Sequence, residues 1–445
     1  MEEGTATTAV PPSLGSAAAE LLQGLIRVDT VNPPGNERRV QEELQRMLSE
    51  AGFECELLAA EPERPNLVAR LCGERDGPTL TLLGHVDTVR ADPEEWTHDP
   101  WGGAQIDGWI WGRGALDMKG QVAAEVAACL ELARSGWRPA GELMLVLTAD
   151  EEAGGTLGAR WLCRQHPDRV RTDLVVNEGG GALIEIGGRR LYTMGVGEKG
   201  VFRIRLRMEG RAGHASLPRI GDNALLRLSG HLAALAEQPP PEPGAVGEAL
   251  LEALCGDSFR GAEGVRAGLE RLRAEQPLLA DYLVEPMLGV TLTPTKALAG
   301  KKANVIPSEA EALIDCRVPP GYGEEEARRQ LAAMIGEGDY AIEFTEAIAG
   351  NTSPIGSPLA DAIRAWMADA DPGAEILPTI MPGFSDSNPF RTAFPEAIVY
   401  GFCPHREITQ IEQAPLIHGA DERVPVADIE FAAAFFHDLP RRILS

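Results

Sequence analysis

A histidine and an aspartate stand two residues apart directly after an apolar segment, in the sequence Gly84-His85-Val86-Asp87. In an extended backbone such side chains leave the same face, so the Asp87 carboxylate is placed to orient the His85 imidazole. Imidazoles that bind a metal ion are supported by carboxylates in this way. Taken alone, the pair favours a structural histidine, so its chemistry depends on the rest of the chain.

Carboxylates gather at two further places. Asp117 lies between a glycine-rich turn and an alanine-rich segment, where its simplest role is that of a helix N-cap. Asp150, Glu151 and Glu152 directly follow the apolar segment 142–149. Ligands of open α/β sheets bind at strand ends, and crowded carboxylates need a cation or a shared proton. A metal site therefore explains this acidic triplet as well as solvation does.

Two later segments repeat the pattern. Glu178 follows the apolar segment 173–177 and precedes three glycines, which allow the backbone to approach a site closely. His418, near the C-terminal end of the chain, supplies a second imidazole. Each of these segments is ambiguous by itself, so their order along the chain carries more information than any one of them.

The elements that must position these residues alternate between strand and helix patterns. Strands are predicted at residues 66–71, 79–83, 142–148 and 173–177, and helices within 13–48 and at 120–135, 156–165, 359–370 and 426–444. Alternation of this kind indicates an α/β sheet with helices on both faces. The acidic segments would then lie at strand ends of this sheet.

The pattern changes at about residue 199. Arginines at 203, 205 and 207 alternate with apolar residues, which predicts a half-exposed strand of a different sheet. A proline-rich break at 237–244 and a helical, charge-rich stretch at 248–283 follow, and further strands are predicted at 303–318 and 340–346. We therefore predict that residues 1–198 and 352–445 form one α/β domain and that residues 199–351 form a second domain inserted into it.

The composition is that of a globular enzyme: 445 residues, 44% of them hydrophobic and 24% charged, are enough for two domains. A net charge of −26 argues against nucleic acid or an anionic membrane as a partner. No apolar run approaches the ~20 residues of a membrane span, and residues 1–16 have no basic region typical of an export signal. The seven cysteines are scattered and form no Cys-x-x-Cys pair, so we expect a reducing, cytoplasmic compartment.

Taken in chain order, the five segments resemble the dinuclear zinc peptidase family that contains aminoacylase, carboxypeptidase S, glutamate carboxypeptidase, acetylornithine deacetylase and succinyl-diaminopimelate desuccinylase. The segments are Gly84–Asp87, Trp111–Gly120, Asp150–Gly155, Asn177–Gly181 and Ile417–Glu422. The resemblance covers nearly the whole chain. It implies an α/β zinc-peptidase catalytic domain with a mixed sheet flanked by helices, plus an inserted α+β dimerisation (lid) domain.

The resemblance also implies a set of metal ligands. Asp117 would bridge two ions, His85 and Glu178 would complete one site, and Glu152 and His418 would complete the other. Two imidazoles and three carboxylates suit two Zn²⁺ ions, with Co²⁺ or Mn²⁺ as substitutes.

Two acidic residues beside these ligands have implied roles of their own. Glu151 would be the general base, which takes a proton from the attacking water and passes it to the leaving amine. Asp87 would support the His85 ring. The peptide between Asp117 and Met118 would be cis, as the resemblance implies.

The inserted domain carries residues that resemble the family's substrate-side positions. His214, in the sequence Arg-Ala-Gly-His-Ala-Ser, would reach the active site of the partner subunit in a homodimer and stabilise the oxyanion. Asn304 and Arg317 would contact substrate, Arg317 by holding a carboxylate, although Arg317 could equally be a strand-surface residue. Gly383, within Pro-Gly-Phe-Ser-Asp, resembles the family's glycine-containing substrate loop.

The predicted reaction is hydrolysis of an amide bond in an N-acyl amino acid or short peptide that carries a carboxylate. A carboxypeptidase or dipeptidase of the same family is an alternative that these segments do not separate from a deacylase. A catalytically silent binding homodimer is a third reading. Loss of Glu151 or of a ligand would favour it, and none is lost.

Overall fold

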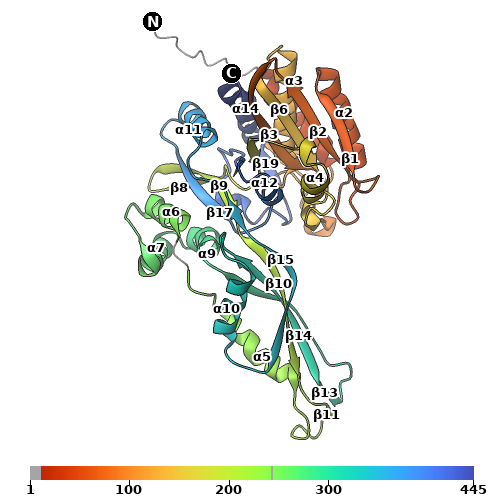
Figure 1. Cartoon of the computed structure of the whole chain (residues 1–445), viewed down its shortest axis with the longest axis vertical. Helices are drawn as coiled ribbons and strands as arrows, with labels where there is room; N and C mark the ends of the chain where they lie inside the picture. Colours follow the sequence, from red (N-terminus) through yellow and green to blue (C-terminus); the bar gives the residue numbers. More distant parts are fainter. Residues whose placement is uncertain (1–11, 242–243) are drawn as a thin grey trace. The chain divides into compact units, whose positions relative to one another are not determined.

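The computed structural model describes residues 12–241 and 244–445, and the chain divides into two compact units (Figure 1). The first unit contains the described residues up to Val196, together with Ser353–Pro378 and Ser385–Ser445, and the second contains Gly197–Thr352 and Thr379–Phe384. The short segment Thr379–Phe384 departs from the predicted boundaries because its Met381 carbonyl accepts the Lys199 N–H of the second unit. Two segments lie outside the described residues: 1–11 and 242–243. The first contains most of the N-terminal stretch in which no export signal is predicted, and the second belongs to the proline-rich break.

The first unit is built on a mixed sheet, in the strand order β1-β2-β6-β3-β7-β18-β9. Its strands are β1 (Glu54–Ala59), β2 (Pro65–Cys72), β3 (Arg75–His85), β6 (Ala140–Thr148), β7 (Leu174–Asn177), β18 (Ile398–Gly401) and β9 (Arg189–Glu198), with β8 (Leu183–Ile186) and β17 (Glu375–Met381) paired to β9. Strands β6, β3, β7 and β18 run parallel to one another, whereas the pairs β1–β2, β2–β6 and β18–β9 are antiparallel. A three-stranded ribbon of β4 (Ala104–Ile106), β5 (Trp109–Trp111) and β19 (Arg423–Pro425) accompanies it.

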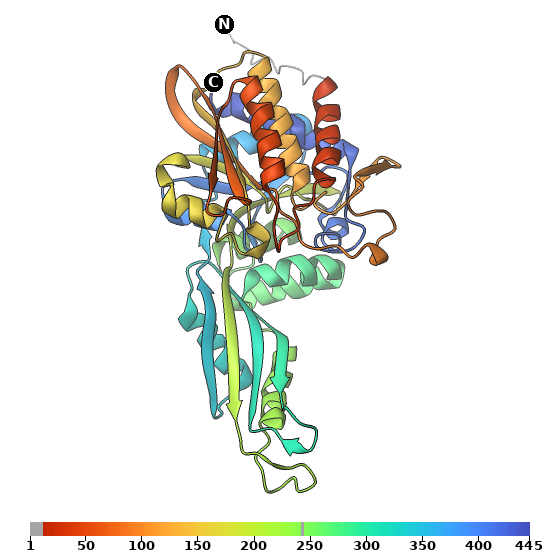
Figure 2. The same ribbon diagram turned by 90° about the vertical axis from the view of Figure 1, so that its right-hand side faces the viewer.

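Helices flank this sheet. They are α1 (Pro12–Ile26), α2 (Arg38–Ala51), α3 (Lys119–Arg134), α4 (Ala159–Gln165), α11 (Pro358–Ala370), α12 (Ser387–Ala393), α13 (Gln410–Gln413) and α14 (Val426–Ile443). Helix α3 is buried along nearly its whole length because α1, α2 and α14 pack around it, and Figure 2 shows the N-terminal helices side by side. Helices α4 and α12 close a separate apolar cluster against β6, β7 and β18. The predicted mixed sheet flanked by helices is confirmed.

The second unit contains an antiparallel sheet in the order β12-β14-β10-β15. These strands are β12 (Thr291–Ala299), β14 (Glu309–Val318), β10 (Gly200–Glu209) and β15 (Tyr340–Ile348), and β16 (Asn351–Thr352) pairs with the end of β9. Helices α5 (Ala224–Ala233) and α10 (Glu324–Ile335) cover one face of the sheet, where the apolar residues of β10 lie. The alternation predicted for β10 is confirmed, because its arginines occupy the opposite face.

A helical segment between α5 and β12 elaborates this unit, as the sequence predicts. It comprises α6 (Ala245–Cys255), α7 (Gly261–Glu275), α8 (Pro277–Leu279), a π-helical turn at Ala280–Val284 and α9 (Glu285–Leu288). A small ribbon of β11 (Gly213–His214) and β13 (Val305–Ile306) completes the unit. Within the described residues, no helix combines the length and the hydropathy needed to cross a membrane.

Candidate metal centre

Three neighbouring parallel strands deliver most of the predicted site residues to one edge of the first sheet. Strand β3 ends at His85, which pairs with Thr148 at the end of β6. The turn after β6 carries Glu151 and Glu152, and Glu178 directly follows β7. Because the carboxyl ends of parallel strands meet at the same edge, side chains distant in the sequence come together there.

Asp117 lies between the two imidazoles. Its Oδ1 is 3.2 Å from His85 Nε2 and its Oδ2 is 3.0 Å from His418 Nε2. His418 Nε2 is also 3.1 Å from Glu152 Oε2, and His85 Nε2 is 3.9 Å from Glu178 Oε1. Each oxygen of Asp117 therefore faces one histidine, and each histidine has at least one glutamate nearby.

Asp117 is not a helix N-cap, which corrects the simplest interpretation of its sequence position. Helix α3 begins at Lys119 and Met118 occupies the cap position. The predicted cis peptide between Asp117 and Met118 is present.

Glu151 lies within the same group of side chains. Its Oε2 is 3.9 Å from His85 Nε2, and atoms of His85, Glu151 and Glu178 lie within 4.8 Å of one another. Burial raises the pKa of Glu151 well above its ordinary value, and Glu178 raises it further against the attraction of His85. The structure thus gathers all six sequence-predicted residues of the centre in the first unit.

The residues of this centre fit divalent metal ions. Burial raises the pKa values of Glu178 and Glu152, whereas the hydrogen bonds to Asp117 and Glu152 raise the pKa of His418 to about 10. Crowded carboxylates of this kind are stabilised by a cation. Glu152 Oε1 is buried and has no hydrogen-bond partner among the described residues. Imidazoles and carboxylates form a donor set that suits zinc.

Asp87 supports both His85 and the acidic turn. Its backbone carbonyl lies 3.1 Å from His85 Nδ1, while its carboxylate is 3.5 Å from the same nitrogen. The carboxylate accepts the N–H groups of Glu151 at 3.2 Å and Glu152 at 3.1 Å. Asp87 therefore holds the imidazole, as the sequence predicted. It also holds the main chain of the acidic turn, which the sequence did not predict.

Glu422 is a further residue that the sequence analysis missed. It is fully buried and accepts four N–H groups: Arg113 Nη1, Gly114 N, Leu116 N and Asp117 N. These contacts fix the loop that carries Asp117. Its position four residues after His418 was the available signal, because both residues belong to the same C-terminal segment.

Asp386 is the second missed residue. It is buried, its Oδ2 accepts a hydrogen bond from Thr148 Oγ1, and its Oδ1 has no hydrogen-bond partner among the described residues. Burial raises the pKa of Asp386 to about 6. In the sequence, the resemblance marks the segment around Gly383 but not this carboxylate.

His214 lies in the second unit, exposed on the short strand β11. The N–H of Ser216 donates to its Nδ1 at 3.2 Å. In the neutral ring the proton then resides on Nε2, so Nε2 is a hydrogen-bond donor. This is the tautomer that stabilising an oxyanion requires.

The predicted substrate-side residues also lie in the second unit. Asn304 is exposed, and its carbonyl accepts the Ala215 N–H at 3.0 Å. The Arg317 guanidinium donates to both oxygens of Asp315, at 2.7 Å and 3.3 Å. Arg317 therefore already holds a carboxylate of its own strand. Gly383 has room for a Cβ, since the closest atom would be 3.8 Å away.

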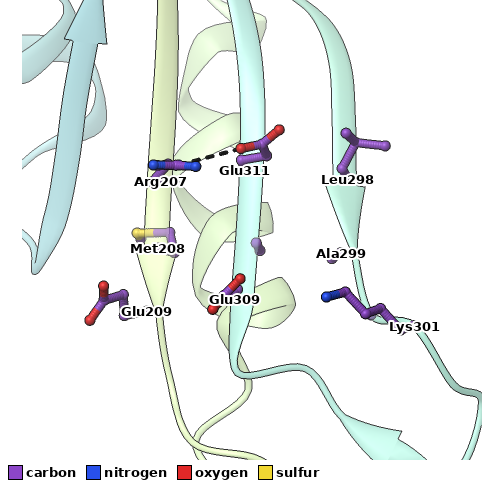
Figure 3. A pocket seen from close by; sticks show the side chains of 10 residues that line it. Arg207, Met208, Glu209, Leu298, Ala299, Lys301, Glu309 and Glu311 are labelled. Atoms are coloured by element: carbon purple, nitrogen blue, oxygen red, sulfur yellow. Dashed lines mark hydrogen bonds and ion pairs between the residues drawn. The ribbon is translucent and has the colours of Figure 1, made fainter.

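A hollow of about 340 Å³ opens where β10 and β12 end and β14 begins in the second unit (Figure 3). Its lining includes Leu298, Lys301 and the ion pair of Arg207 with Glu311, whose Nε and Oε2 atoms are 3.4 Å apart. Among the described residues, the sequence-predicted site residues do not line this hollow. It takes no part in the centre described above.

Comparison with known proteins agrees with this arrangement. The sequence model of peptidase family M20/M25/M40 matches residues 81–442. The succinyl-diaminopimelate desuccinylase of Methylobacterium nodulans is 30% identical over 447 residues, covering 95% of this chain and 94% of that protein. A probable carboxypeptidase S-like 2 of Dictyostelium discoideum is 27% identical over 379 residues, covering 81% of this chain and 70% of that protein.

Solved structures share the fold at lower sequence identity. An M20 family metallo-carboxypeptidase from Sulfolobus solfataricus has a TM-score of 0.73 at 16% identity, over 96% of this chain and 98% of that chain. Human carnosine dipeptidase 1 has a TM-score of 0.65 at 17% identity, over 96% of each chain. The family match spans most of the sequence, and the chain is therefore a hydrolytic enzyme that belongs to peptidase family M20/M25/M40.

Proposed function

We propose that this enzyme hydrolyses an amide bond in an N-acyl amino acid or short peptide, with Glu151 as general base beside two zinc ions. The observation that carries the proposal is the placement of Asp117, whose two oxygens face His85 at 3.2 Å and His418 at 3.0 Å. A carboxylate shared between two imidazoles, each with a glutamate nearby, suits a bridged pair of ions better than one ion.

The ligand assignment follows the neighbours of Asp117. His85 and Glu178 would hold one ion with Asp117, while Glu152 and His418 would hold the other. When bound, the ions would supply Lewis acidity for the substrate carbonyl and the attacking water. Zinc is the proposed metal, with cobalt or manganese as substitutes.

Glu151 would accept a proton from water and return it to the leaving amine. Burial raises its pKa well above its ordinary value, which makes its carboxylate a stronger proton acceptor. Asp87 holds the Glu151 main chain through its N–H, so the base would be oriented before substrate binds.

The second unit is proposed to be a dimerisation and lid domain. Apolar residues on and near α5 and β13 are exposed, among them Leu217, Ile220 and Leu226 at 55%, 52% and 68%. Such a patch is covered in a stable protein by a partner, here a second copy of the chain. His214, on the adjacent strand β11, would then contribute its Nε2 donor to the partner subunit's active site.

The proposed substrate carries a carboxylate, and Asn304, Arg317 and Gly383 are proposed to contact it. For Arg317 this requires that substrate replace or share Asp315. The named relatives include both a desuccinylase and a carboxypeptidase S-like protein, so a carboxypeptidase or dipeptidase remains the second candidate. We place the enzyme in the cytoplasm, which is supported by seven free cysteines, all within the described residues.

A substrate panel tests the proposal. Zinc-loaded enzyme is incubated with N-succinyl, N-acetyl and long-chain N-acyl amino acids, with dipeptides, and with peptides whose C-terminal carboxylate is free or blocked. Amine release is measured. Hydrolysis of acyl amino acids well above that of dipeptides supports the deacylase. Preferential removal of C-terminal residues would support the carboxypeptidase instead. No hydrolysis of any member by metal-loaded protein would contradict both.

A further inference from the structure

A chain of buried polar side chains connects Arg64, which is itself buried, to the acidic turn Asp150–Glu152. Arg64 directly precedes β2 and is 7% exposed. Its Nε and Nη2 donate to the two oxygens of Glu37 at 3.0 Å and 2.5 Å, and its Nη1 donates to Asp150 Oδ1 at 3.0 Å. Every nitrogen of the guanidinium therefore has a carboxylate partner.

Asp150 ties together the turn that carries Glu151 and Glu152. Its Oδ2 accepts Thr156 Oγ1 and Leu157 N, both at 3.0 Å, and its carbonyl accepts the Gly155 N–H at 2.6 Å. The residue has φ of 67° although it is not glycine, a left-handed conformation that surrounding contacts must stabilise. The contact with Arg64 is one of those that hold it.

Asn32 links Asp150 to Asp87. Its Nδ2 donates to Asp87 Oδ2 at 2.8 Å and to Asp150 Oδ1 at 3.2 Å. Asp87 in turn accepts the N–H groups of Glu151 and Glu152. Arg64 thus acts on the acidic turn through Asp150, both directly and by way of Asn32, which joins Asp150 to Asp87.

The surroundings of Arg64 are shaped for a guanidinium group. Gly35 has φ of 78°, and a Cβ at this position would lie 2.3 Å from the Cζ, Nε and Nη2 atoms of Arg64. Glu37, Asp87 and Asp150 are all buried, so removal of Arg64 would leave Asp150 without its cationic partner. A shorter or uncharged side chain would not satisfy both Glu37 and Asp150.

We propose that Arg64 is a positioning residue for hydrolysis: it fixes the Asp150–Glu152 turn and so orients the carboxylates of Glu151 and Glu152. The inference rests on the proposed function, because it takes Glu151 as general base and Glu152 as a metal ligand. It differs from a purely structural ion pair, which would change stability without changing turnover of the folded enzyme.

The test compares Arg64→Met and Arg64→Lys with Arg70→Met. Arg70 lies on β2 and pairs with Glu142, and both side chains are partly buried. Arg70→Met therefore removes the same charge from a nearby ion pair that does not contact the acidic turn. We expect Arg64→Met to lower kcat by about ten- to a hundredfold with KM nearly unchanged and metal content retained. Arg64→Lys should recover part of the loss, because lysine keeps the charge but not the fork.

A second readout does not depend on activity. In cobalt-substituted protein the visible absorption spectrum reports the arrangement of the ligands, so it should change in Arg64→Met and stay unchanged in Arg70→Met. Wild-type kcat together with a wild-type spectrum in Arg64→Met would overturn the proposal. If that variant does not fold, Asp150→Asn, which keeps the size of the side chain, should show the same fall in kcat, and normal turnover in it would overturn the proposal equally.

Failure of this inference is distinguishable from failure of the proposed function. If Glu151→Gln turns over normally, the assignment of the base is wrong and the role of Arg64 falls with it. If Glu151→Gln is inactive while Arg64→Met has wild-type turnover and spectrum, only the positioning role is refuted.

Discussion

At the residue scale, the centre combines groups whose protonation is set by burial and by one another. Asp117 shares its oxygens between two imidazoles, and burial raises the pKa of the nearby Glu151. Such perturbed groups concentrate where chemistry is done. Glu151 faces His85 at 3.9 Å, and Asp87 accepts its N–H, so its carboxylate and its main chain are both constrained.

The first prediction concerns the base. Glu151→Gln keeps the size of the side chain but removes its ability to accept a proton, so kcat should fall roughly 10²- to 10⁴-fold. Metal content by mass spectrometry should stay at the wild-type value, because the five proposed ligands remain. Near-normal turnover in this variant would require a different base.

The sequence predicted the six residues of the centre and the support of His85 by Asp87, but not the other groups that hold them. Imidazoles and carboxylates at strand ends can be recognised because their chemistry is unusual in that position. Arg64 and Glu422 are ordinary charged residues in sequence, and only the fold shows that they are buried against the acidic turn and the Asp117 loop. Arg317 is the opposite case. Its sequence position suggests a guanidinium group available to substrate, whereas in the structure this group donates to Asp315.

At the scale of elements, the loop between β5 and α3 depends on Glu422. Burial raises the pKa of this carboxyl to about 6 although four N–H groups face it. Replacing a carboxylate oxygen by an NH₂ group in Glu422→Gln would set donor against donor. We expect a loss of about 2–3 kcal/mol in the free energy of unfolding and weaker zinc binding.

Urea unfolding and zinc titration check this prediction. The matched control is Glu407→Gln, an exposed glutamate in the segment that precedes α13, which should leave both quantities unchanged. Equal stability and equal zinc affinity in Glu422→Gln and the control would show that Glu422 does not hold the loop.

A buried lysine at the start of the second unit gives a pH dependence. Burial lowers the pKa of Lys199 from 10.5 to about 7, and its Nζ donates to the Pro286 carbonyl at 2.9 Å. Between pH 7 and pH 10.5 the unfolded chain binds a proton that the folded chain does not. The free energy of unfolding therefore rises with pH in this window, by up to a few kcal/mol.

Lys199→Met should lack this rise. Unfolding of wild-type protein, of this variant and of Lys296→Met is measured at pH 7 and pH 9, since Lys296 is exposed on β12 and gives the same change of side chain. The wild type and Lys296→Met should gain more stability than Lys199→Met between the two pH values. Equal gains in all three proteins would show that Lys199 stays protonated in the folded state.

At the scale of the whole molecule, the alternation of strands and helices predicted the α/β sheet and an inserted unit, whereas the mixed sheet and the α+β character of the insertion followed from the resemblance. The assignment of Thr379–Phe384 to the second unit was not predicted, because a main-chain hydrogen bond from Lys199 to Met381 leaves no trace in residue types. The mode of assembly is likewise a proposal, resting on exposed apolar residues around α5 and on the resemblance.

The fourth prediction tests assembly. His214→Ala should lose activity with its metals retained, and mixing it with Glu151→Gln should restore some activity, because one site of a hybrid dimer combines intact Glu151 with the partner's intact donor. Differently tagged chains establish that hybrids form. A monomer by light scattering, or confirmed hybrids without activity, would refute shared sites while leaving the metal centre unaffected.

The most direct test of metal-dependent hydrolysis at this centre is reconstitution of chelator-treated protein. Zinc is added in steps while metal content and amine release from the best substrate of the panel are measured together. We predict that the metal-free protein is inactive and that activity returns with zinc and saturates at about two equivalents per chain. Full hydrolysis by metal-free protein would contradict the account.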